Sequence, residues 1–389
     1  MSEVRIGIIG FGGIAMLHSK YILAGEVPGA TLAAVCDINP QCLEQLKDID
    51  FKNIKTFTKP EEMFKSGLVD AVMITTPHYE HPPLAIAALK HNLHVLIEKP
   101  AGVYTKQVIE MNNFATETNK VFAIMFNCRC KPIYRKLKEI IDTGQLGSIK
   151  RTNWIITDWY RSQSYYDAGK WRATWAGEGG GVLLNQCPHQ LDLWQWICGM
   201  PKRVRAFCDF GKYHQIEVED DVTAYVEYEN GATGIFIAST GEAPGTNRFE
   251  ISGDLGKIVV ENGEITFWKN SVSERQFNRE YKGGFGTPEC TQLKIPIEGV
   301  DDAHKGITAN WVQAILNSTP LIAPGNEGLN SLELSNAMLL SAWQDDWVSL
   351  PADAELFHKK LQEKIKNSTQ SKKNAQSKIL DVGNSLHKN

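Results

Sequence analysis

The chain has 389 residues, 42% hydrophobic and 22% charged, with a formal net charge of −4, which is the composition of a globular protein with room for two domains. The lack of a basic surplus argues against a nucleic-acid partner. No stretch approaches about 18 apolar residues, and the first residues lack the regions of a signal peptide, so we expect a cytoplasmic protein without a membrane span.

The first 125 or so residues alternate short apolar strands with helical segments. This alternation predicts βαβ units and a parallel sheet, an α/β fold. Strands are expected at 4–9, 32–36, 69–75, 95–98 and 121–126, and helices at 14–24, 41–47, 83–91 and 106–118. We interpret residues 1–128 as a nucleotide-binding domain.

After about residue 130 the pattern changes to strands separated by Asn-Gly turns, which indicates a mostly antiparallel sheet in a second domain, residues 129–360. The last 25 or so residues are rich in Lys, Asn, Ser and Gln, so we expect a frayed helix and then a disordered tail, and we assign 361–389 as a flexible tail. Strands are expected at 222–228, 234–238, 249–252, 257–260 and 264–268, and helices at 133–142, 309–316 and 331–342, the last two packing back on the first domain.

A glycine-rich turn follows the first strand and opens the first helix. In the pattern Gly-x-Gly-x-x-Ala, the first glycine makes the turn, the second admits a pyrophosphate and the small last residue allows helix and strand to pack. We expect this turn to bind a dinucleotide, although a purely structural turn has the same pattern. Its residues are Gly10, Phe11, Gly12, Gly13, Ile14 and Ala15.

An acidic residue, Asp37, ends the second strand about 22 residues after Ala15. Its carboxylate suits a ribose 2′-hydroxyl and would repel a 2′-phosphate, and neither Ile38 nor Asn39 brings a positive charge. We therefore predict NAD in preference to NADP. A helix or turn cap is the alternative role for Asp37.

Two further strand ends carry candidate residues. Ligands bind at the carboxyl edge of an open parallel sheet, and a charge there is costly unless it is used. Lys99 is therefore the first candidate for chemistry. The predicted cofactor contacts are Thr75, Thr76, Pro77, His81 and Glu98. His78 is a further candidate for contact with the cofactor, and the alternative for His78 and His81 is a role as loop or cap residues.

In the second domain, the run from Gly179 to Gly181 precedes Asn185, His189 and Asp192, which share a face if one helix carries all three. His189 is the candidate general base, and a buried, hydrogen-bonded histidine is its alternative. Asn is a poor ligand for transition metals, and the eight cysteines show no paired CxxC spacing, so no metal is expected.

Aromatic residues are concentrated just upstream, between Trp154 and Trp175. Aromatic faces pack on sugar rings while charged groups bind hydroxyls, so the loop around Tyr160, Trp171 and Arg172 resembles a polyol or sugar pocket. Simple packing of these rings is the alternative.

Together these residues resemble the Gfo/Idh/MocA oxidoreductases, the family of glucose–fructose oxidoreductase and inositol dehydrogenase. The likeness implies a Rossmann domain followed by an α+β domain with a large open sheet, whose two faces form the ligand pocket and a subunit interface, hence a homodimer or homotetramer. It also implies hydride transfer between a ring carbinol and NAD. The matching positions are Gly10 to Ala15, Asp37, Thr76-Pro77, Glu98-Lys99-Pro100 and Gly179 to His189.

The resemblance implies roles for single residues. Lys99 matches the conserved lysine, His189 the catalytic histidine, and Trp171-Arg172 a pair near the nicotinamide. We place Asn127, Tyr160 and Trp171 with Lys99, Asn185 and His189 among the substrate-binding residues.

Asn185 departs from the family pattern, because many members have aspartate there and Asn cannot exchange a proton. The Asn-Gln-Cys-Pro-His version resembles a branch that oxidises glycosides at C3. We therefore expect 3-dehydrogenation of a glucoside. The alternatives are a cyclic polyol such as inositol as substrate, cleavage or epimerisation of glycosides with recycled NAD, and a non-catalytic sugar or NAD sensor.

Overall fold

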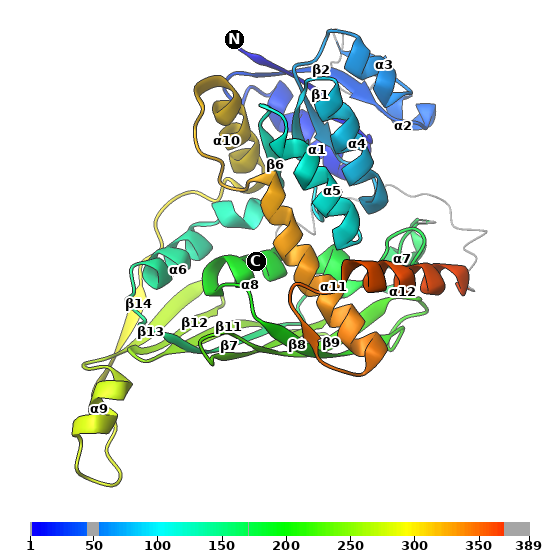
Figure 1. Cartoon of the computed structure of the whole chain (residues 1–389). Helices are drawn as coiled ribbons and strands as arrows, with labels where there is room; N and C mark the ends of the chain where they lie inside the picture. The colour runs from blue at the N-terminus through cyan, green and yellow to red at the C-terminus, as the bar shows by residue number, and fades with distance from the viewer. Residues whose placement is uncertain (1, 45–53, 170, 369–389) are drawn as a thin grey trace.

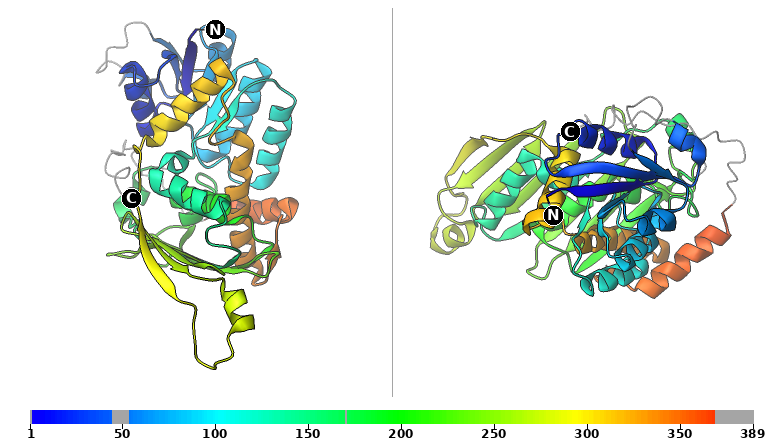
Figure 2. Two further views of the ribbon diagram at one scale, coloured as in Figure 1. Left: turned by 90° about the vertical axis from the view of Figure 1, so that its left-hand side faces the viewer. Right: turned by 90° about the horizontal axis from the view of Figure 1, so that it is seen from above.

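Two β-sheets organise this computed structural model, which describes residues 2–44, 54–169 and 171–368 (Figure 1). The six-stranded sheet comes first in the chain and the nine-stranded sheet second. No helix within these ranges is long and apolar enough to cross a membrane. Helices lie between the first sheet and the broad face of the second sheet (Figures 1 and 2).

The first sheet is parallel throughout, in the order β3-β2-β1-β4-β5-β6. The central strands are buried on both faces, which explains their continuous apolar runs. This is the strand order of the Rossmann fold, as expected. The strands are β1 Val4–Ile9, β2 Ala30–Cys36, β3 Lys55–Phe57, β4 Ala71–Ile74, β5 His94–Ile97 and β6 Phe122–Ile124, and the helices are α1 Gly13–Leu23, α2 Pro40–Glu44, α3 Pro60–Lys65, α4 His81–Lys90 and α5 Thr105–Thr116.

The second sheet has the order β14-β13-β12-β11-β7-β10-β9-β8-β15, antiparallel except for the β7–β10 pair, which confirms the mostly antiparallel prediction. Helices α6, α8 and α11 cover the face turned toward the first sheet (Figure 1). The strands are β7 Ile149–Ile156, β8 Arg203–Phe210, β9 Glu219–Glu227, β10 Thr233–Ser239, β11 Asn247–Gly253, β12 Gly256–Glu261, β13 Glu264–Asn270, β14 Cys290–Ile295 and β15 Val348–Ser349, and the helices are α6 Pro132–Asp142, α7 Gln163–Asp167, α8 Pro188–Cys198, α9 Glu274–Glu280, α10 Ala303–Asn317, α11 Gly328–Gln344 and α12 Ala354–Lys366.

The late helices return to the first domain, as predicted. Helix α10 packs against α1 and β1, and α11 and α12 pack against α5. The hydroxyl of Tyr21 in α1 lies 2.8 Å from that of Thr308 in α10, and the amide of Ile124 donates to the carbonyl of Ala323 over 3.1 Å. Helices α10, α11 and α12 therefore cover part of the surface of the first domain.

Several elements differ from the sequence-based expectation. The short strand β3 and the strands β8 and β14 were not predicted, because they are half-exposed or open to solvent and lack a strong apolar pattern. The tail was predicted to begin too early, since α12 continues through Lys366 and buries Leu361 completely. The end of the helix expected at 41–47, and residues 369–389 of the expected tail, lie outside the described residues.

Candidate active site

The glycine turn after β1 has the geometry that its sequence predicts. Gly10 has a φ of +87°, and a Cβ there would lie 2.8–2.9 Å from Thr76 at the end of β4. A Cβ on Gly12 would meet no described atom within 4 Å, so open space adjoins the backbone at this position. Ala15 is fully buried where α1 packs on the sheet.

The first turn of α1 offers backbone N–H groups to a ligand. Gly12 is the N-cap of the helix, and no side chain among the described residues caps it. Gly13 and Ile14 begin the helix, and Ile14 is only half-buried. Unpaired N–H groups and the positive end of the helix dipole suit a pyrophosphate, so these residues fit a bound dinucleotide.

Asp37 lies beside this turn. Its Oδ2 accepts a hydrogen bond of 2.7 Å from the amide of Phe11, and its Oδ1 accepts one of 2.8 Å from the amide of Asn39. The capping role considered from the sequence is therefore real. A carboxylate has about four acceptor positions, which leaves capacity for ribose hydroxyls as well.

The loop after β4 connects the two domains. Thr75 donates its hydroxyl to the carbonyl of Gly10 over 2.6 Å, while the buried Oγ1 of Thr76 has no partner among the described residues. Pro77 precedes the short 3₁₀ helix η2, His78–Glu80. His78 is buried, and its Nδ1 lies 3.0 Å from the carbonyl oxygen of Glu178.

His81 was predicted to contact the cofactor, but its position argues for a structural role. It is buried, with Nδ1 2.7 Å from the carbonyl of Pro100 and Nε2 2.7 Å from the carbonyl of Thr76. Burial lowers the pKa of the imidazole. His81 therefore ties the loop after β4 to the loop after β5.

Glu98 also departs from its predicted cofactor contact. It is buried, and its Oε1 lies 2.8 Å from Nε2 of His18. Burial alone would raise the pKa of this carboxyl, but the hydrogen bond from His18 together with the charges of His18, His304 and Lys99 lowers the pKa to about 2. Glu98 is thus a buried negative charge next to Lys99, and it connects β5 to α1.

Lys99 reaches across to the second domain. Its Nζ donates a hydrogen bond of 3.0 Å to the main-chain carbonyl of Asn185. Burial lowers the pKa of its amine below the ordinary 10.5, an effect that Glu98 and Glu178 oppose and Arg172 strengthens. The ammonium group of Lys99, predicted at the end of a strand, is therefore held against the segment that follows the glycine run.

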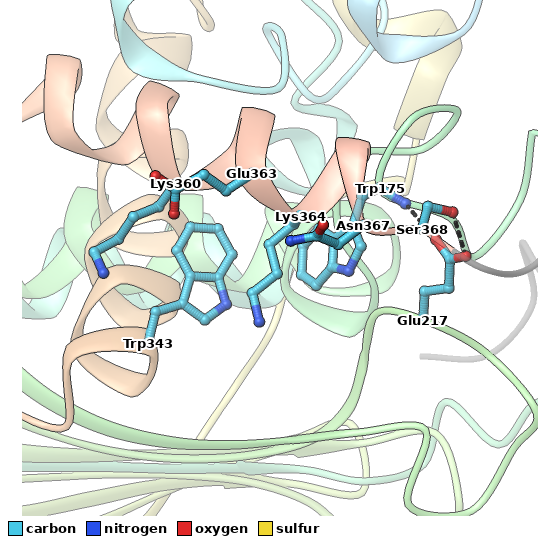
Figure 3. Close-up of a pocket in the computed structure, with 8 residues that line it drawn as sticks. All are labelled: Trp175, Glu217, Trp343, Lys360, Glu363, Lys364, Asn367 and Ser368. Atoms are coloured by element: carbon cyan, nitrogen blue, oxygen red, sulfur yellow. Dashed lines mark hydrogen bonds between the residues drawn. The ribbon is translucent and has the colours of Figure 1, made fainter.

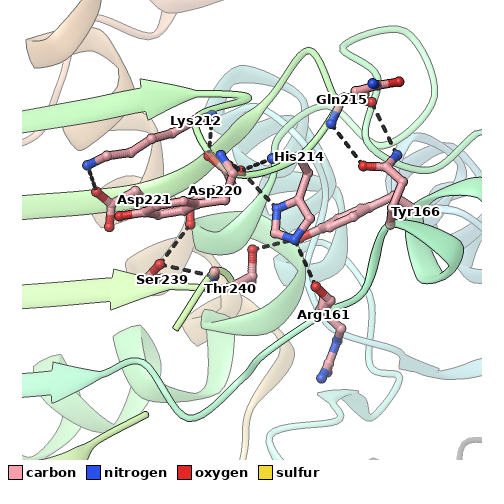
Figure 4. A network of polar contacts seen from close by, with 12 residues as sticks. Arg161, Tyr166, Lys212, His214, Gln215, Asp220, Asp221, Ser239 and Thr240 are labelled. Atoms are coloured by element: carbon pink, nitrogen blue, oxygen red, sulfur yellow. Dashed lines mark hydrogen bonds and ion pairs between the residues drawn. The ribbon is translucent and has the colours of Figure 1, made fainter. Parts of the chain in front are cut away.

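A polar network anchors the loop that carries Tyr160 and Trp171 (Figure 4). Asp220 lies 2.9 Å from Nδ1 of His214, whose Nε2 lies 2.8 Å from the carbonyl of Arg161. The Tyr166 hydroxyl lies 2.8 Å from that of Thr240. The start of β9 and the residue after β10 therefore fix both the start and the middle of this loop.

The glycine run is pinned to β9. Both carboxylate oxygens of Glu219 accept hydrogen bonds of 2.9 Å from the amide of Gly181, and Oε1 accepts one of 3.0 Å from Leu183. A Cβ on Gly181 would lie 1.9 Å from the Glu219 carbonyl oxygen, so only glycine fits. Burial raises the pKa of Glu219 to about 7.

Asn185, His189 and Asp192 do not share one continuous helix. Asn185 belongs to a π-helical segment, Val182–Gln186, and α8 begins only at Pro188. Asp192 accepts hydrogen bonds of 2.8 and 2.6 Å from buried Arg129. That ion pair uses the carboxylate for structure, since it holds the Arg129 guanidinium in place.

His189 has the properties of a proton acceptor. Its Nδ1 is buried, and neither ring nitrogen has a hydrogen-bond partner among the described residues. Burial first, and then the charge of Lys99, hold the pKa of the imidazole well below its usual 6.5. The ring is therefore mostly neutral at pH 7, and the charge of Lys99 is one of the groups that act on it.

Polar side chains around Asn185 form a cluster that the sequence did not reveal as a unit. The Asn185 amide donates to Oε1 of Glu178 and, over 3.3 Å, to the Tyr165 hydroxyl. Arg172 donates to the same hydroxyl over 2.7 Å, and its guanidinium lies 4.6 Å from the centre of the Trp171 ring. Glu178, next to the glycine run, and Tyr165, in the aromatic stretch, are the additions to the predicted site.

The two remaining predicted substrate contacts differ in exposure. Asn127 is buried, with its Oδ1 unpartnered among the described residues and its Nδ2 3.5 Å from Nδ1 of His304. Tyr160 is 46% exposed, which places it at the edge of the anchored loop. Within the described ranges, no group of three or more His, Cys, Asp or Glu is arranged to hold a metal ion.

A separate cavity of about 480 Å³ lies beside α12, lined by Trp175, Trp343, Lys364 and Glu217, among others (Figure 3). None of the predicted site residues lines it. It adjoins the loop that carries Trp171 through Trp175 and through Glu217, whose amide donates a hydrogen bond of 3.2 Å to the carbonyl of Ala173.

A Rossmann sheet with an open glycine turn, and with a lysine at its edge that reaches the second domain, fits an NAD-binding oxidoreductase. Residues 4–126 match the model of the oxidoreductase family with an NAD-binding Rossmann fold, and residues 134–259 match the GFO/IDH/MocA C-terminal domain. The chain belongs to the GFO/IDH/MocA family.

Relatives of known activity resemble the chain at modest identity. The D-glucoside 3-dehydrogenase of Escherichia coli is 28% identical over 59% of this chain and 68% of its own length. The scyllo-inositol 2-dehydrogenase (NAD(+)) of Bacillus subtilis is 24% identical over 85% and 95%. The WlbA dehydrogenase of Bordetella pertussis, solved with NADH and UDP-GlcNAcA, has a TM-score of 0.77 and 25% identity over 90% of this chain and 100% of its own.

Proposed function

We propose that the protein oxidises a ring carbinol of a sugar or glycoside with NAD, and that its substrate is a glucoside oxidised at C3. The observation that carries this proposal is the hydrogen bond of Lys99, at the edge of the Rossmann sheet, to the main-chain carbonyl of Asn185, four residues before His189. The likeness to D-glucoside 3-dehydrogenase supports the choice of substrate.

His189 acts as the general base and takes the hydroxyl proton of the substrate, because its ring is neutral at pH 7 and has no hydrogen-bond partner within the described ranges. Lys99 donates a hydrogen bond to the same oxygen, where negative charge develops. NAD, when bound, accepts hydride from the carbinol carbon. The roles of the two side chains follow from their chemistry and from their place at one edge of the sheet.

The remaining polar groups bind and orient the substrate. Asn127 and Asn185 offer amides for ring hydroxyls, and Trp171 and Tyr160 offer faces for the ring carbons. Asp37 selects NAD over NADP through the ribose hydroxyls. We place this activity in the cytoplasm, which is the location expected from the sequence.

A panel of glucosides, free sugars and inositols tests the proposal. We expect NADH absorbance to rise with glucosides and the product to be the 3-keto compound. Turnover with inositols alone would favour the second candidate, which the likeness to scyllo-inositol 2-dehydrogenase supports. Protein that purifies with NAD and turns over without added cofactor would favour recycling, and binding without redox change across the panel would favour a sensor.

We also propose that the uncovered face of the nine-stranded sheet joins two copies of the chain. Phe207 is 60% exposed on that face, near Tyr225 and Ile235, whose Cα atoms pair across β9 and β10. The excursion that carries α9 extends beyond the same face (Figures 1 and 2), buries no residue of its helix and ends in fully exposed Phe285. A seven-residue helix without such packing is unstable in water, so a partner is needed.

Light scattering of the purified chain measures this association. Ile235→Lys and Phe285→Ser are expected to shift the protein toward monomer, because they put a charge in the apolar face and remove the exposed ring. Thr291→Lys, on the edge strand β14, is the matched surface control. A wild-type monomer, or variants that associate like wild type, would contradict the interface.

A further inference from the structure

The carboxylate of Glu178 lies inside the candidate site, although no motif marked it. The residue is 1% exposed, and its Oε2 accepts a hydrogen bond of 2.5 Å from the amide of Ala173. Its Oε1 accepts from Nδ2 of Asn185, and the Arg172 guanidinium lies 4.0 Å away. A carboxylate this deeply buried persists only if hydrogen bonds and nearby charges compensate it.

Asn185 stands between this carboxylate and Lys99. Its side-chain amide faces Glu178, while its main-chain carbonyl accepts the hydrogen bond from Lys99. The charged groups that act on Lys99 include Glu98 at the end of β5, Glu178 beside the glycine run, and Arg161 and Arg172 on the anchored loop. The two carboxylates favour the ammonium form and the two guanidiniums oppose it. The negative charge of Glu178 therefore belongs to the electrostatic balance of the site.

We propose that Glu178 is a positioning residue that supplies the carboxylate of the Asn185–Arg172 cluster, and that Asn185 is an amide because this carboxylate is already present. The inference rests on the proposed function and adds a residue to it. Glu178 fixes the Asn185 amide and Arg172, and through Asn185 it sets the segment that holds Lys99.

The proposal can be tested by exchanging the two groups, so that position 178 carries the amide and position 185 carries the carboxylate. Asn185→Asp alone sets two carboxylates in contact with no donor between them, and like charges at that distance repel strongly. Glu178→Gln alone leaves Arg172 and Lys99 without their shared negative charge. In the double variant, the new amide at position 178 donates to the new carboxylate at position 185, and its carbonyl still accepts from Ala173, so one charge and one hydrogen bond are restored.

Steady-state oxidation of methyl β-D-glucoside, followed as NADH, provides the first measurement. Each single variant is expected to lose at least about tenfold in kcat/KM, and the double variant to return to within about threefold of wild type, because neighbours in one network are not additive. Glu178→Gln is also expected to move the alkaline fall in kcat/KM to lower pH, and the double variant to move it back. A merely structural carboxylate would give no such return.

Two controls keep the outcomes separate. Glu217→Gln removes another carboxylate that accepts a main-chain N–H from the same loop, at Trp175, but it lies outside the cluster and should leave kcat/KM unchanged. Unfolding temperatures of the wild type, the two single variants and the double variant test the coupling without any substrate. If the changes in unfolding temperature are not additive but the protein does not oxidise the glucoside, the proposed substrate is refuted and the Glu178 proposal stands. If the two single losses of kcat/KM simply add in the double variant of an active enzyme, the Glu178 proposal alone is overturned.

Discussion

The two halves of the candidate site are built in different ways. The half on the Rossmann sheet consists of main-chain geometry within contiguous stretches, such as the turn at Gly10 and the first turn of α1. The half on the second domain consists of side chains from separate segments, which meet around Asn185. Short sequence patterns specify the first kind of site, whereas the second depends on how the loops are anchored.

The largest expected effect comes from the two side chains that join these halves. His189→Ala and Lys99→Ala are each expected to reduce single-turnover NAD reduction by about 10²–10⁴-fold, because proton transfer and stabilisation of the developing charge are lost. Stopped-flow absorbance at saturating NAD measures this rate. Near wild-type rates in both variants would refute the assignment of the catalytic pair.

The pH dependence of kcat/KM tests the two halves separately. We expect His189, in the second half, to determine the acid limb and Lys99, in the first half, to determine the alkaline limb. The pKa of His189 is well below 6.5, so activity should stay level through neutral pH and fall only as acid protonates the ring. The pKa of Lys99 is below 10.5, so activity should fall again as alkali removes its charge. The measurement is kcat/KM from about pH 4 to pH 10. An acid limb centred at pH 6.5 or above would contradict the burial of His189.

A pair of glycine variants separates fold from ligand within the first half. Gly10→Ala meets Thr76 and has a positive φ, so we expect it to lower the free energy of unfolding by about 1–3 kcal/mol. Gly12→Ala has open space and should unfold like wild type, while NAD affinity falls about tenfold because the methyl group occupies the approach of the pyrophosphate. Denaturation and NAD titration measure the two effects. Equal NAD affinity of wild type and Gly12→Ala would argue against binding at this turn.

The smallest effect is expected at the rim of the second half. Tyr160→Ala removes a ring that is already 46% exposed. Stability should change by less than about 0.5 kcal/mol, and KM for the glucoside should rise by only about threefold, with kcat unchanged. A large fall in kcat would mean that the anchored loop closes over the substrate.

The sequence was sufficient where one segment builds one feature. The parallel sheet, the glycine turn, and the positions of Asp37 and Lys99 follow from local patterns, and the structure has them as predicted. Local patterns did not reveal the structural contacts of Glu98 and His81, because their partners, His18 and the carbonyls of two loops, are brought close only by the fold.

The same limit explains what was missed in the second half. Glu178 stands beside three glycines and resembles any loop carboxylate until the fold buries it against Asn185. The spacing of Asn185, His189 and Asp192 suggested one helix face, but the π-helical segment before Pro188 changes the register. Non-local contacts decide such positions, and no local pattern encodes them.

The return of α10 and α11 to the first domain has a consequence for biosynthesis. The amide of Ile124 in the edge strand β6 donates a hydrogen bond to the carbonyl of Ala323, and the hydroxyl of Tyr21 in α1 is hydrogen-bonded to that of Thr308. A nascent chain emerging from the ribosome therefore exposes this flank of its cofactor domain until some two hundred further residues have been made. Truncation before α10 should leave the nucleotide-binding half prone to aggregation, even though its own sheet is complete.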